Sequence, residues 1–378
     1  MTDGAPRPLV TFYVMTYNQA RFVRPAVEAA LAQTYSPLQV VLSDDCSTDG
    51  TFDIIQDVAK AYSGPHHVVL NRNDRNLGIS DHVNRIIELA AGELIIAADG
   101  DDVSSPIRAE RLVDVWMKNG RPAALYSAVS CIDAAGDPSE RDGNKWFAQF
   151  LPVEHESRGD RLLRFVKDGS PRLVSCSASW TKELCEAFGP LPSRVWFEDD
   201  LITLRAWLFD RIDYVPEALV NYRQHDANVF NRVEPPLTTR KARENAEQVT
   251  SAVARRRREC FMSYGRDLEL AVRRGWITRP LCNEIKVHVE RNGALHQVIE
   301  DWWNVNWLLR LALLVFAIRF GRLGEGRWCS PRLLPFKVFL ALGAIWGKVR
   351  SAGLAGRPAL FSPAVVGDAG HAPRGELM

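Results

Sequence analysis

The chain has 378 residues, a length that suits one large domain or two ordinary ones. Hydrophobic residues make up 46% and charged residues 25%, which excludes fibrous, collagenous and wholly disordered chains. The 47 basic and 46 acidic residues leave a formal net charge of +1, so bulk charge argues against a nucleic-acid-binding protein. Seven scattered Cys without a CxxC pair, and a polar start without a signal-like apolar segment, predict a cytoplasmic protein without disulfides.

The first 130 residues alternate short apolar runs with amphipathic helical patterns. Strands are expected at residues 9–15, 38–42, 67–70 and 93–98, and helices at 21–33, 51–61 and 80–91. Such alternation predicts a parallel sheet with helices on both faces. Ligands of these sheets gather at the carboxyl ends of the strands.

Beyond residue 130 the alternation is less regular and predicts the second half of a mixed sheet. Further strands are expected at 123–129, 174–180 and 213–215, and helices at 160–167 and 199–209. After Pro235-Pro236 a long charged helix is expected over about 239–274. The predicted organisation is a catalytic domain at 1–235, a helical C-terminal region at 236–350 and a disordered tail at 351–378.

Three acidic clusters follow predicted strands or open a predicted helix: Asp44-Asp45, residues 99–102 (DGDD) and residues 198–200 (EDD). Each alone is more often a turn or helix cap, but three at one end of a sheet favour function. Hard cations such as Mg²⁺ or Mn²⁺ take one or two carboxylates together with substrate phosphate oxygens. No GxGxxG follows the first strand and no GxxxxGK[ST] occurs, so dinucleotide and P-loop sites lack support.

Several motifs together resemble the family 2 glycosyltransferases over roughly residues 8–231. The motifs are Thr16-Tyr17-Asn18, Gln33-Thr34-Tyr35, the DDCSTDGT turn at 44–51, Arg75 to Gly78, DGDD with Pro106, Glu198-Asp199 with Arg205, and Tyr222 to His225. The resemblance implies a GT-A fold, an α/β mixed sheet with helices on both faces, here with a C-terminal helical appendix. It also implies an inverting enzyme that uses a nucleotide-sugar donor, most often UDP-linked, with Mn²⁺ or Mg²⁺.

The resemblance also implies roles for the residues that match its donor-binding motifs. Tyr17, Asp44 and Arg75 would lie around the nucleotide base, and Asp99 would face the ribose or the metal. The full donor-binding set is Thr16, Tyr17, Asn18, Asp44, Asp45, Arg75, Gly78, Asp99 and Gly100.

Metal-binding and catalytic roles follow from the same resemblance. Asp101 would bind the metal directly, Asp102 would support it, and His225 would close over the metal and diphosphate. Asp199 would be the general base, with Glu198 as the neighbour that orients the acceptor or tunes the base. Displacement at an anomeric carbon needs such a base opposite the leaving group.

Two positions depart from the family pattern. Cys46 stands where Gly is frequent in the first acidic turn, so a turn that needs a positive φ is less comfortable there. Leu201 replaces a frequent acidic residue after the Glu-Asp pair, whereas Asp200 adds one earlier. Asp200 is therefore the rival of Asp199 for the role of base.

The C-terminal third leaves alternatives open. The run Arg255 to Arg258 is expected to be a solvated helix face that pairs with nearby Glu residues, rather than an anionic-ligand patch. Residues 302–320 and 333–346 are hydrophobic, but Arg310 disfavours a membrane span. These two stretches, which lie within residues 302–346, are expected either to lie at a membrane surface or to form core or oligomer contacts. A membrane surface would suit a lipid-linked acceptor.

Two other functions remain alternatives at this point. A nucleotidyltransferase acting on sugar phosphates also uses carboxylates and Mg²⁺, but residues 16–19 offer no Gly-rich basic loop for a triphosphate. A degenerate glycan-binding scaffold would be expected to lose one acidic cluster, and all three are present. Acceptor specificity is expected to depend on residues 133–156 and on the surroundings of Trp196.

Overall fold

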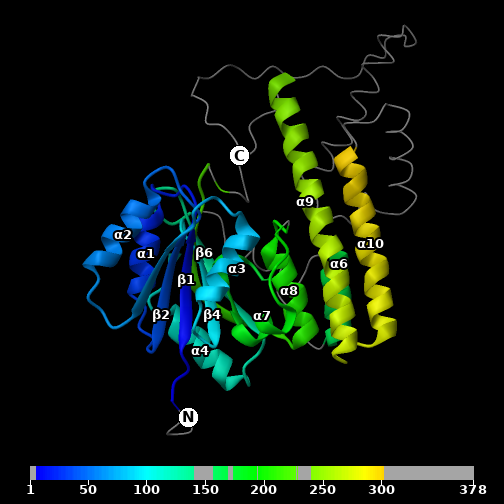
Figure 1. The fold of residues 1–378 in the computed structure, drawn as a ribbon, viewed down its shortest axis with the longest axis horizontal. Coiled ribbons are helices and arrows are strands. Elements are labelled where there is room, and N and C mark those ends of the chain that lie inside the picture. Colours follow the sequence, from blue (N-terminus) through cyan, green and yellow to red (C-terminus); the bar gives the residue numbers. More distant parts are fainter. Residues whose placement is uncertain are drawn as a thin grey trace. The chain divides into compact units, whose positions relative to one another are not determined.

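Eight strands form one mixed sheet in the computed structural model, which describes residues 6–139, 156–168, 173–193, 195–226, 228 and 240–301 (Figure 1). The strands are β1 (Val10–Thr16), β2 (Leu38–Asp44), β3 (His67–Arg72), β4 (Leu94–Asp99), β5 (Val103–Ser104), β6 (Ala124–Ile132), β7 (Ala178–Thr181) and β8 (Ile212–Arg223). Their order is β3-β2-β1-β4-β7-β6-β8-β5. Strands β3, β2, β1 and β4 are parallel, and β7 runs antiparallel to its neighbours β4 and β6.

Nine α-helices accompany the sheet in the described residues. They are α1 (Val23–Leu31), α2 (Thr51–Ala61), α3 (Ile79–Leu89), α4 (Arg108–Lys118), α6 (Arg158–Asp168), α7 (Lys182–Phe188), α8 (Glu198–Phe209), α9 (Arg240–Arg273) and α10 (Arg279–Asp301). A 3₁₀ helix, Ser175–Ser177, precedes β7.

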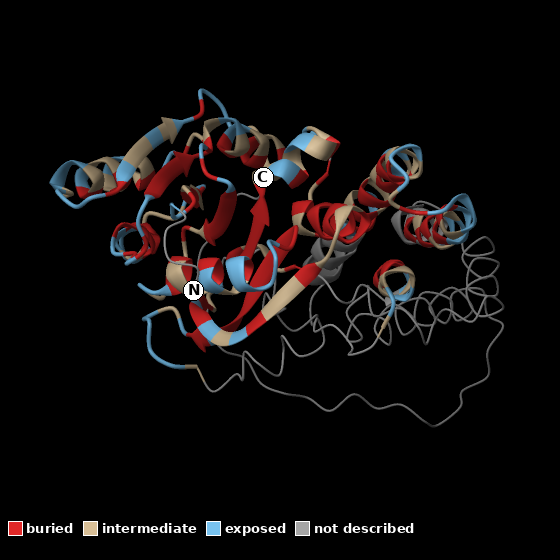
Figure 2. Cartoon of the chain, turned by 90° about the horizontal axis from the view of Figure 1, so that it is seen from below, coloured by how far each residue is buried: buried red, intermediate tan, exposed pale blue. Residues whose placement is uncertain are grey.

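Alternating side chains of the parallel strands build two hydrophobic clusters, one on each face of the sheet. Phe12 and Val14 of β1 belong to a cluster that contains α1, α2 and α4, whereas Tyr13 between them belongs to the other. The second cluster includes α3, α6, α7 and α8. Because both faces are covered, the central strands β1, β2 and β4 are mostly apolar and buried. Several strands are red, and therefore buried, in Figure 2. This arrangement confirms the predicted α/β mixed sheet with helices on both faces.

The sequence analysis missed three helices, α4, α7 and α10, and predicted one strand too short. Helix α4 has apolar Ala109, Leu112, Val113 and Trp116 at helical spacing, and α10 follows α9 after a turn at Gly275. Strand β8 is much longer than the predicted 213–215, and its register against β6 shifts twice around Ala128. Pro216 interrupts the strand pattern, and the irregular register accommodates it.

Residues 174–180 were predicted as one strand, but only the end of this segment is extended. Ser175–Ser177 forms the 3₁₀ helix and β7 begins at Ala178. The Ser177 side chain donates a hydrogen bond to the Val174 carbonyl 3.2 Å away, a local contact that competes with strand pairing.

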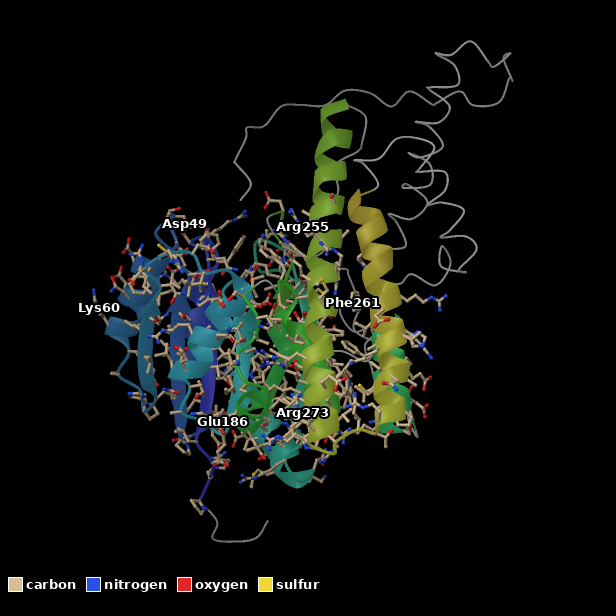
Figure 3. All side chains as sticks on the ribbon, turned by 45° about the vertical axis from the view of Figure 1, so that its right-hand side comes forward. Asp49, Lys60, Glu186, Arg255, Phe261 and Arg273 are labelled. Carbon is tan, nitrogen blue, oxygen red and sulfur yellow. The ribbon has the colours of Figure 1, made fainter. Side chains whose placement is uncertain are left out.

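Helices α9 and α10 pack beside α6 and α8 and share the hydrophobic cluster of that sheet face (Figure 1). Buried Phe261, Tyr264 and Leu268 of α9 meet Phe165 of α6 and the apolar side of α8. Phe261, labelled in Figure 3, lies on α9 between Arg255 and Arg273. The boundary predicted at residue 235 stays a prediction.

Among the described residues, no helix combines the length and apolar character that crossing a membrane requires. The hydrophobic stretches at 302–320 and 333–346 and the tail at 351–378 lie outside the described residues, as do 140–155 of the predicted specificity segment. Their predicted roles therefore stay predictions.

Candidate active site

The first two acidic clusters lie at one edge of the sheet because β1, β2 and β4 are parallel and end in register. Thr16 at the end of β1 pairs with Asp44 of β2, and Met15 pairs with Asp99 of β4. The strand ends thus bring residues 16–18, 44–51 and 99–102 together, as expected for the carboxyl edge of a parallel sheet.

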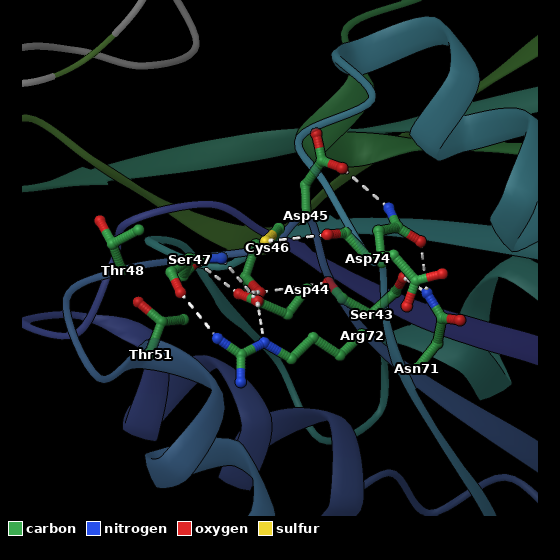
Figure 4. A network of polar contacts seen from close by, with 12 residues as sticks. Ser43, Asp44, Asp45, Cys46, Ser47, Thr48, Thr51, Asn71, Arg72 and Asp74 are labelled. Atoms are coloured by element: carbon green, nitrogen blue, oxygen red, sulfur yellow. Dashed lines mark hydrogen bonds and ion pairs between the residues drawn. The ribbon is translucent and has the colours of Figure 1, made fainter.

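The Asp44 side chain organises the turn after β2 (Figure 4). Its carboxylate is fully buried and accepts hydrogen bonds from the Thr16 hydroxyl at 3.1 Å and from the Ser47 N–H at 2.8 Å. The Arg72 guanidinium lies 3.9 Å away and supplies opposite charge. These contacts fix the position of the turn.

Asp45 joins the same turn to the segment that contains Arg75. Its carboxylate accepts hydrogen bonds from the Asn73 side chain and the Leu77 N–H, both at 2.8 Å, and from the Gly78 N–H at 3.0 Å. Gly78 has a φ of 80°, which favours glycine, and precedes α3. Arg75 itself is exposed at this rim.

Two non-glycine residues of the rim have left-handed backbone conformations. Asn18 has a φ of 50° and Cys46 a φ of 62°. The Asn18 side chain accepts a hydrogen bond from the Thr48 N–H at 2.9 Å, which stabilises this conformation. Cys46 thus occupies the positive-φ position where the family more often has Gly, and Tyr17 next to Asn18 is 40% exposed.

Gly100 is required by a close approach of two loops. Its N–H donates to the Met15 carbonyl at 2.9 Å, which joins the ends of β4 and β1. A Cβ atom there would lie 2.4 Å from Oε1 of Gln19 and 2.6 Å from Cγ2 of Thr16. A larger residue would therefore fit only if the Gln19 and Thr16 side chains moved.

The end of β8 returns His225 to the DGDD loop. His225 Nε2 lies 3.0 Å from Oδ2 of Asp101, although the two residues are 124 positions apart in the sequence. The Arg223 N–H donates to Oδ1 of Asp102 at 2.7 Å, and Arg223 Nε donates to the Asp101 carbonyl at 2.8 Å. The structure therefore places His225 against Asp101 and connects Asp102 to the backbone at the end of β8.

The loop carries more negative charge than its neighbours neutralise. Burial, followed by the charge of Asp101, raises the pKa of Asp99 to about 7. The pKa of Asp102 is also raised by burial, and its Oδ2 is buried without a hydrogen-bond partner among the described residues. Arg108, buried in α4, provides opposing charge, but burial lowers its own pKa to about 10.

This chemistry fits a divalent cation that protein and substrate share. No group of three His, Cys, Asp or Glu suited to a cation occurs in the part of the chain that the structure describes. Asp101 and His225 instead form a pair, and the orphaned Oδ2 of Asp102 lies on the neighbouring residue. Mg²⁺ is typically held by one or two protein ligands, with phosphate oxygens and water completing the coordination.

The third acidic cluster forms the first turn of α8. Acidic side chains are stabilised there because the helix N-terminus carries partial positive charge. Glu198 is buried and accepts a hydrogen bond from the Ser175 hydroxyl at 2.6 Å. Burial and then the charge of Asp199 raise the pKa of Glu198 to about 8.

The two remaining carboxylates of this turn differ in exposure. Asp199 is partly exposed, and its Oδ1 accepts a hydrogen bond from the Asp200 N–H at 2.9 Å. Asp200 is 1% exposed and forms an ion pair with Arg257 of α9. Trp196, close before the cluster, packs its ring against the Arg256 guanidinium at 3.4 Å.

The predicted solvated face at Arg255 to Arg258 is wrong for Arg257. Arg255 is exposed as expected, but Arg257 is 9% exposed and turned toward α8. Glu269, one of the expected partners, pairs instead with Arg279 and Lys286. Spacing along one helix cannot show that a neighbouring helix offers a buried carboxylate.

Sequence reasoning also missed two residues that support the site. Arg108 is fully buried beneath the DGDD loop and donates to the Ser104 hydroxyl at 2.9 Å. Ser175 belongs to the 3₁₀ helix and reaches Glu198 across 23 residues. A charged residue on the apolar side of the unpredicted helix α4 was the available signal for Arg108.

A mixed α/β sheet with carboxylates at the carboxyl ends of its parallel strands is the arrangement expected of the GT-A fold class. Residues 11–182 match the family model described as "Glycosyl transferase family 2". This part of the chain is therefore similar to a family 2 glycosyltransferase domain, and the predicted α/β fold class is confirmed.

Named relatives share this part of the chain. "Chondroitin synthase" of Escherichia coli is 33% identical over 130 residues, which is 34% of this chain and 18% of that protein. "Putative glycosyltransferase EpsE" of Bacillus subtilis is 35% identical over 129 residues, 34% of this chain and 46% of that protein. The chain thus spans less than half of the length of both relatives.

A solved structure is similar over more of the chain at lower identity. The mannosyltransferase PcManGT of Pyrobaculum calidifontis, solved with GDP-Man and Mn²⁺, is 18% identical with a TM-score of 0.48. The similarity covers 92% of this chain and 90% of that chain.

Proposed function

We propose that this protein is an inverting glycosyltransferase that transfers a sugar from a nucleotide-diphosphate donor, UDP-linked, to a hydroxyl of a glycan or lipid-linked acceptor. The observation that carries the proposal is the meeting of Asp101 and His225 beside the buried, charge-rich DGDD loop in a family 2 domain. An acidic site with an orphaned carboxylate oxygen suits a cation and a diphosphate.

Donor binding is assigned to the rim formed by the β1, β2 and β4 ends. Tyr17 and Arg75 are exposed there and would contact the nucleotide. Asp44 and Asp45 are engaged with protein groups, so they would act by fixing the turn that shapes the base pocket. Asp101 and His225 would hold Mn²⁺ or Mg²⁺, and a bound divalent cation would neutralise charge on the leaving diphosphate.

Asp199 is assigned as the general base. A base must come within hydrogen-bond reach of the acceptor hydroxyl, and Asp199 is partly exposed whereas Asp200 is buried in an ion pair. Glu198, with its raised pKa, would hold a proton near neutral pH and donate a hydrogen bond. A single base and no covalent intermediate lead to inversion, from an α-linked donor to a β-linked product.

The test measures nucleotide release from UDP- and GDP-sugars with Mn²⁺ and a panel of oligosaccharide acceptors. Asp199→Ala is expected to abolish transfer while sparing Mn²⁺-dependent UDP binding, and Asp101→Ala is expected to weaken both. Asp57→Asn, at an exposed position of α2, is the matched control and should leave both unchanged. Normal turnover in Asp199→Ala would remove it as the base, and pyrophosphate release from a sugar phosphate and a nucleoside triphosphate would indicate a nucleotidyltransferase.

A further inference from the structure

Helix α9 contacts the acidic first turn of α8 on both sides of the Glu198-Asp199 pair. The Arg257 guanidinium pairs with the carboxylate of Asp200 and packs over the Phe197 ring, 3.5 Å from its centroid. These contacts join a catalytic-domain helix to a helix that begins only at residue 240.

The first turn of α8 lacks an N-cap side chain, although Asp199 Oδ1 accepts a hydrogen bond from the Asp200 N–H. Phe197 at the N-cap makes no side-chain hydrogen bond to the helix N–H groups. Three consecutive acidic side chains repel one another, and Asp200 is almost completely buried. Removing the cation from a buried ion pair is strongly destabilising, so the Arg257 charge helps to hold Asp200 inside.

A second buried ion pair connects the same helices away from the acidic cluster. Arg205 Nε donates to Oδ2 of Asp267 at 2.7 Å, and both residues are at most 4% exposed. Arg205 follows Asp200 by five positions, about 7.5 Å along the helix axis. This pair docks α8 on α9 without touching the Glu198-Asp199 pair in the described contacts, which makes it an internal control.

We propose that Arg257 is a positioning residue for the acceptor-side carboxylates: it holds Asp200 inward against α9 and thereby fixes the first turn of α8 so that Asp199 faces the acceptor. The inference deepens the proposed function and rests on it, because it takes Asp199 as the base. It gives the helical region after residue 240 a part in catalysis as well as in folding.

Charged and titratable groups surround Asp199 from three elements. Its own helix contributes Glu198 and Asp200, β4 contributes Asp99, and α9 contributes Cys260 and Tyr264 together with Arg257. Removing the Arg257 cation takes away the positive charge that pairs with Asp200 next to the base. A like charge beside a carboxylate favours its protonated form, so the base would be lost at higher pH than in the wild type.

The experiment compares initial rates of the full chain for Arg257→Met, Arg257→Lys and the double variant Arg257→Met/Asp200→Asn. Arg257→Met is expected to lower kcat about 100-fold, the effect of a misplaced reacting group, with the donor KM unchanged. The acid limb of its pH profile should move to higher pH. Arg257→Lys should retain most of kcat, and the double variant should recover at least tenfold over Arg257→Met, because no unpaired buried charge remains.

Two control variants separate positioning from general stability. Arg255→Met removes an exposed arginine from the same helix and should leave kcat unchanged. Asp267→Asn breaks the second buried pair and should lower the thermal unfolding midpoint with less than tenfold effect on kcat. The inference is overturned if Arg257→Met behaves like Arg255→Met, or if Asp267→Asn reduces kcat as much as Arg257→Met.

The double variant keeps the inference testable if Arg257→Met does not fold, because it lacks the unpaired carboxylate. A folded double variant with a lower kcat than Arg255→Met and an unchanged donor KM would then support the role of the pair, and wild-type kcat and pH profile would contradict it. If the wild type transfers no sugar from any donor, the proposed function is overturned. If the wild type is active and Arg257→Met has the same kcat, the inference alone is overturned.

Discussion

Replacing Glu198 by Gln tests the electrostatics at the start of α8 without relying on activity. Burial raises the pKa of Glu198 from 4.5 to about 8, so the folded protein holds a proton there that the unfolded chain releases. The stabilisation is complete below pH 4.5 and is lost as the pH rises through 8. Gln has the same shape and cannot ionise, so the variant lacks this pH dependence.

The size of the effect follows from the two pKa values. Between them each pH unit changes the free energy of unfolding by about 1.4 kcal/mol. From pH 6 to pH 8 the free energy of unfolding falls less steeply as the pH approaches the upper pKa. The decrease due to Glu198 over this interval is therefore about 2 kcal/mol. Over this interval the free energy of unfolding of Glu198→Gln should therefore rise by about 2 kcal/mol relative to that of the wild type.

Urea unfolding at pH 6, 7 and 8 in buffer with a chelator measures this difference. Glu186→Gln, on α7, controls for the loss of an acidic residue, since no comparable burial acts on it. If the unfolding free energies of Glu198→Gln and the wild type change in parallel across these pH values, Glu198 is ionised throughout and the electrostatic reasoning is refuted.

Two further predictions concern the DGDD loop. Gly100→Ala should destabilise the fold by about 1–3 kcal/mol and weaken Mn²⁺-dependent UDP binding, because its Cβ would collide with Cγ2 of the stiff Thr16 side chain. Urea unfolding should show a neutral or stabilising effect for Gly265→Ala, where a Cβ meets open space. His225→Ala should weaken Mn²⁺ binding about 10- to 100-fold in titration calorimetry, through the loss of its contact with Asp101. Equal Mn²⁺ affinity in the wild type and His225→Ala would remove this histidine from the metal site.

The nature of the acceptor depends on parts of the chain on both sides of α8. Trp196 and Arg256 stack beside the acidic turn and are placed to contact an acceptor that approaches Asp199. Residues 302–346 carry the prediction of a membrane surface or an oligomer contact. Liposome flotation of the full chain, compared with the chain ending near residue 301, tests the membrane alternative.

The sequence by itself determined the parallel half of the sheet and most of the candidate site. Strands β1, β2 and β4 are apolar because both faces are covered, and their period and length identify them without tertiary information. The acidic clusters follow these strands directly, so strand order alone places Asp44 and Asp99 at one edge. The family resemblance then named the residues and the chemistry.

Only the tertiary structure decided how the distant parts complete the site. His225 meets Asp101 across 124 residues, and Arg257 meets Asp200 across 57, contacts for which no helical or strand period gives a signal. An arginine in a charged run has the same local pattern whether it faces water or a buried carboxylate. Burial is a property of the packed elements, and therefore the sequence indicated which residues were acidic, whereas the fold distinguished the exposed Asp199 from the paired Asp200.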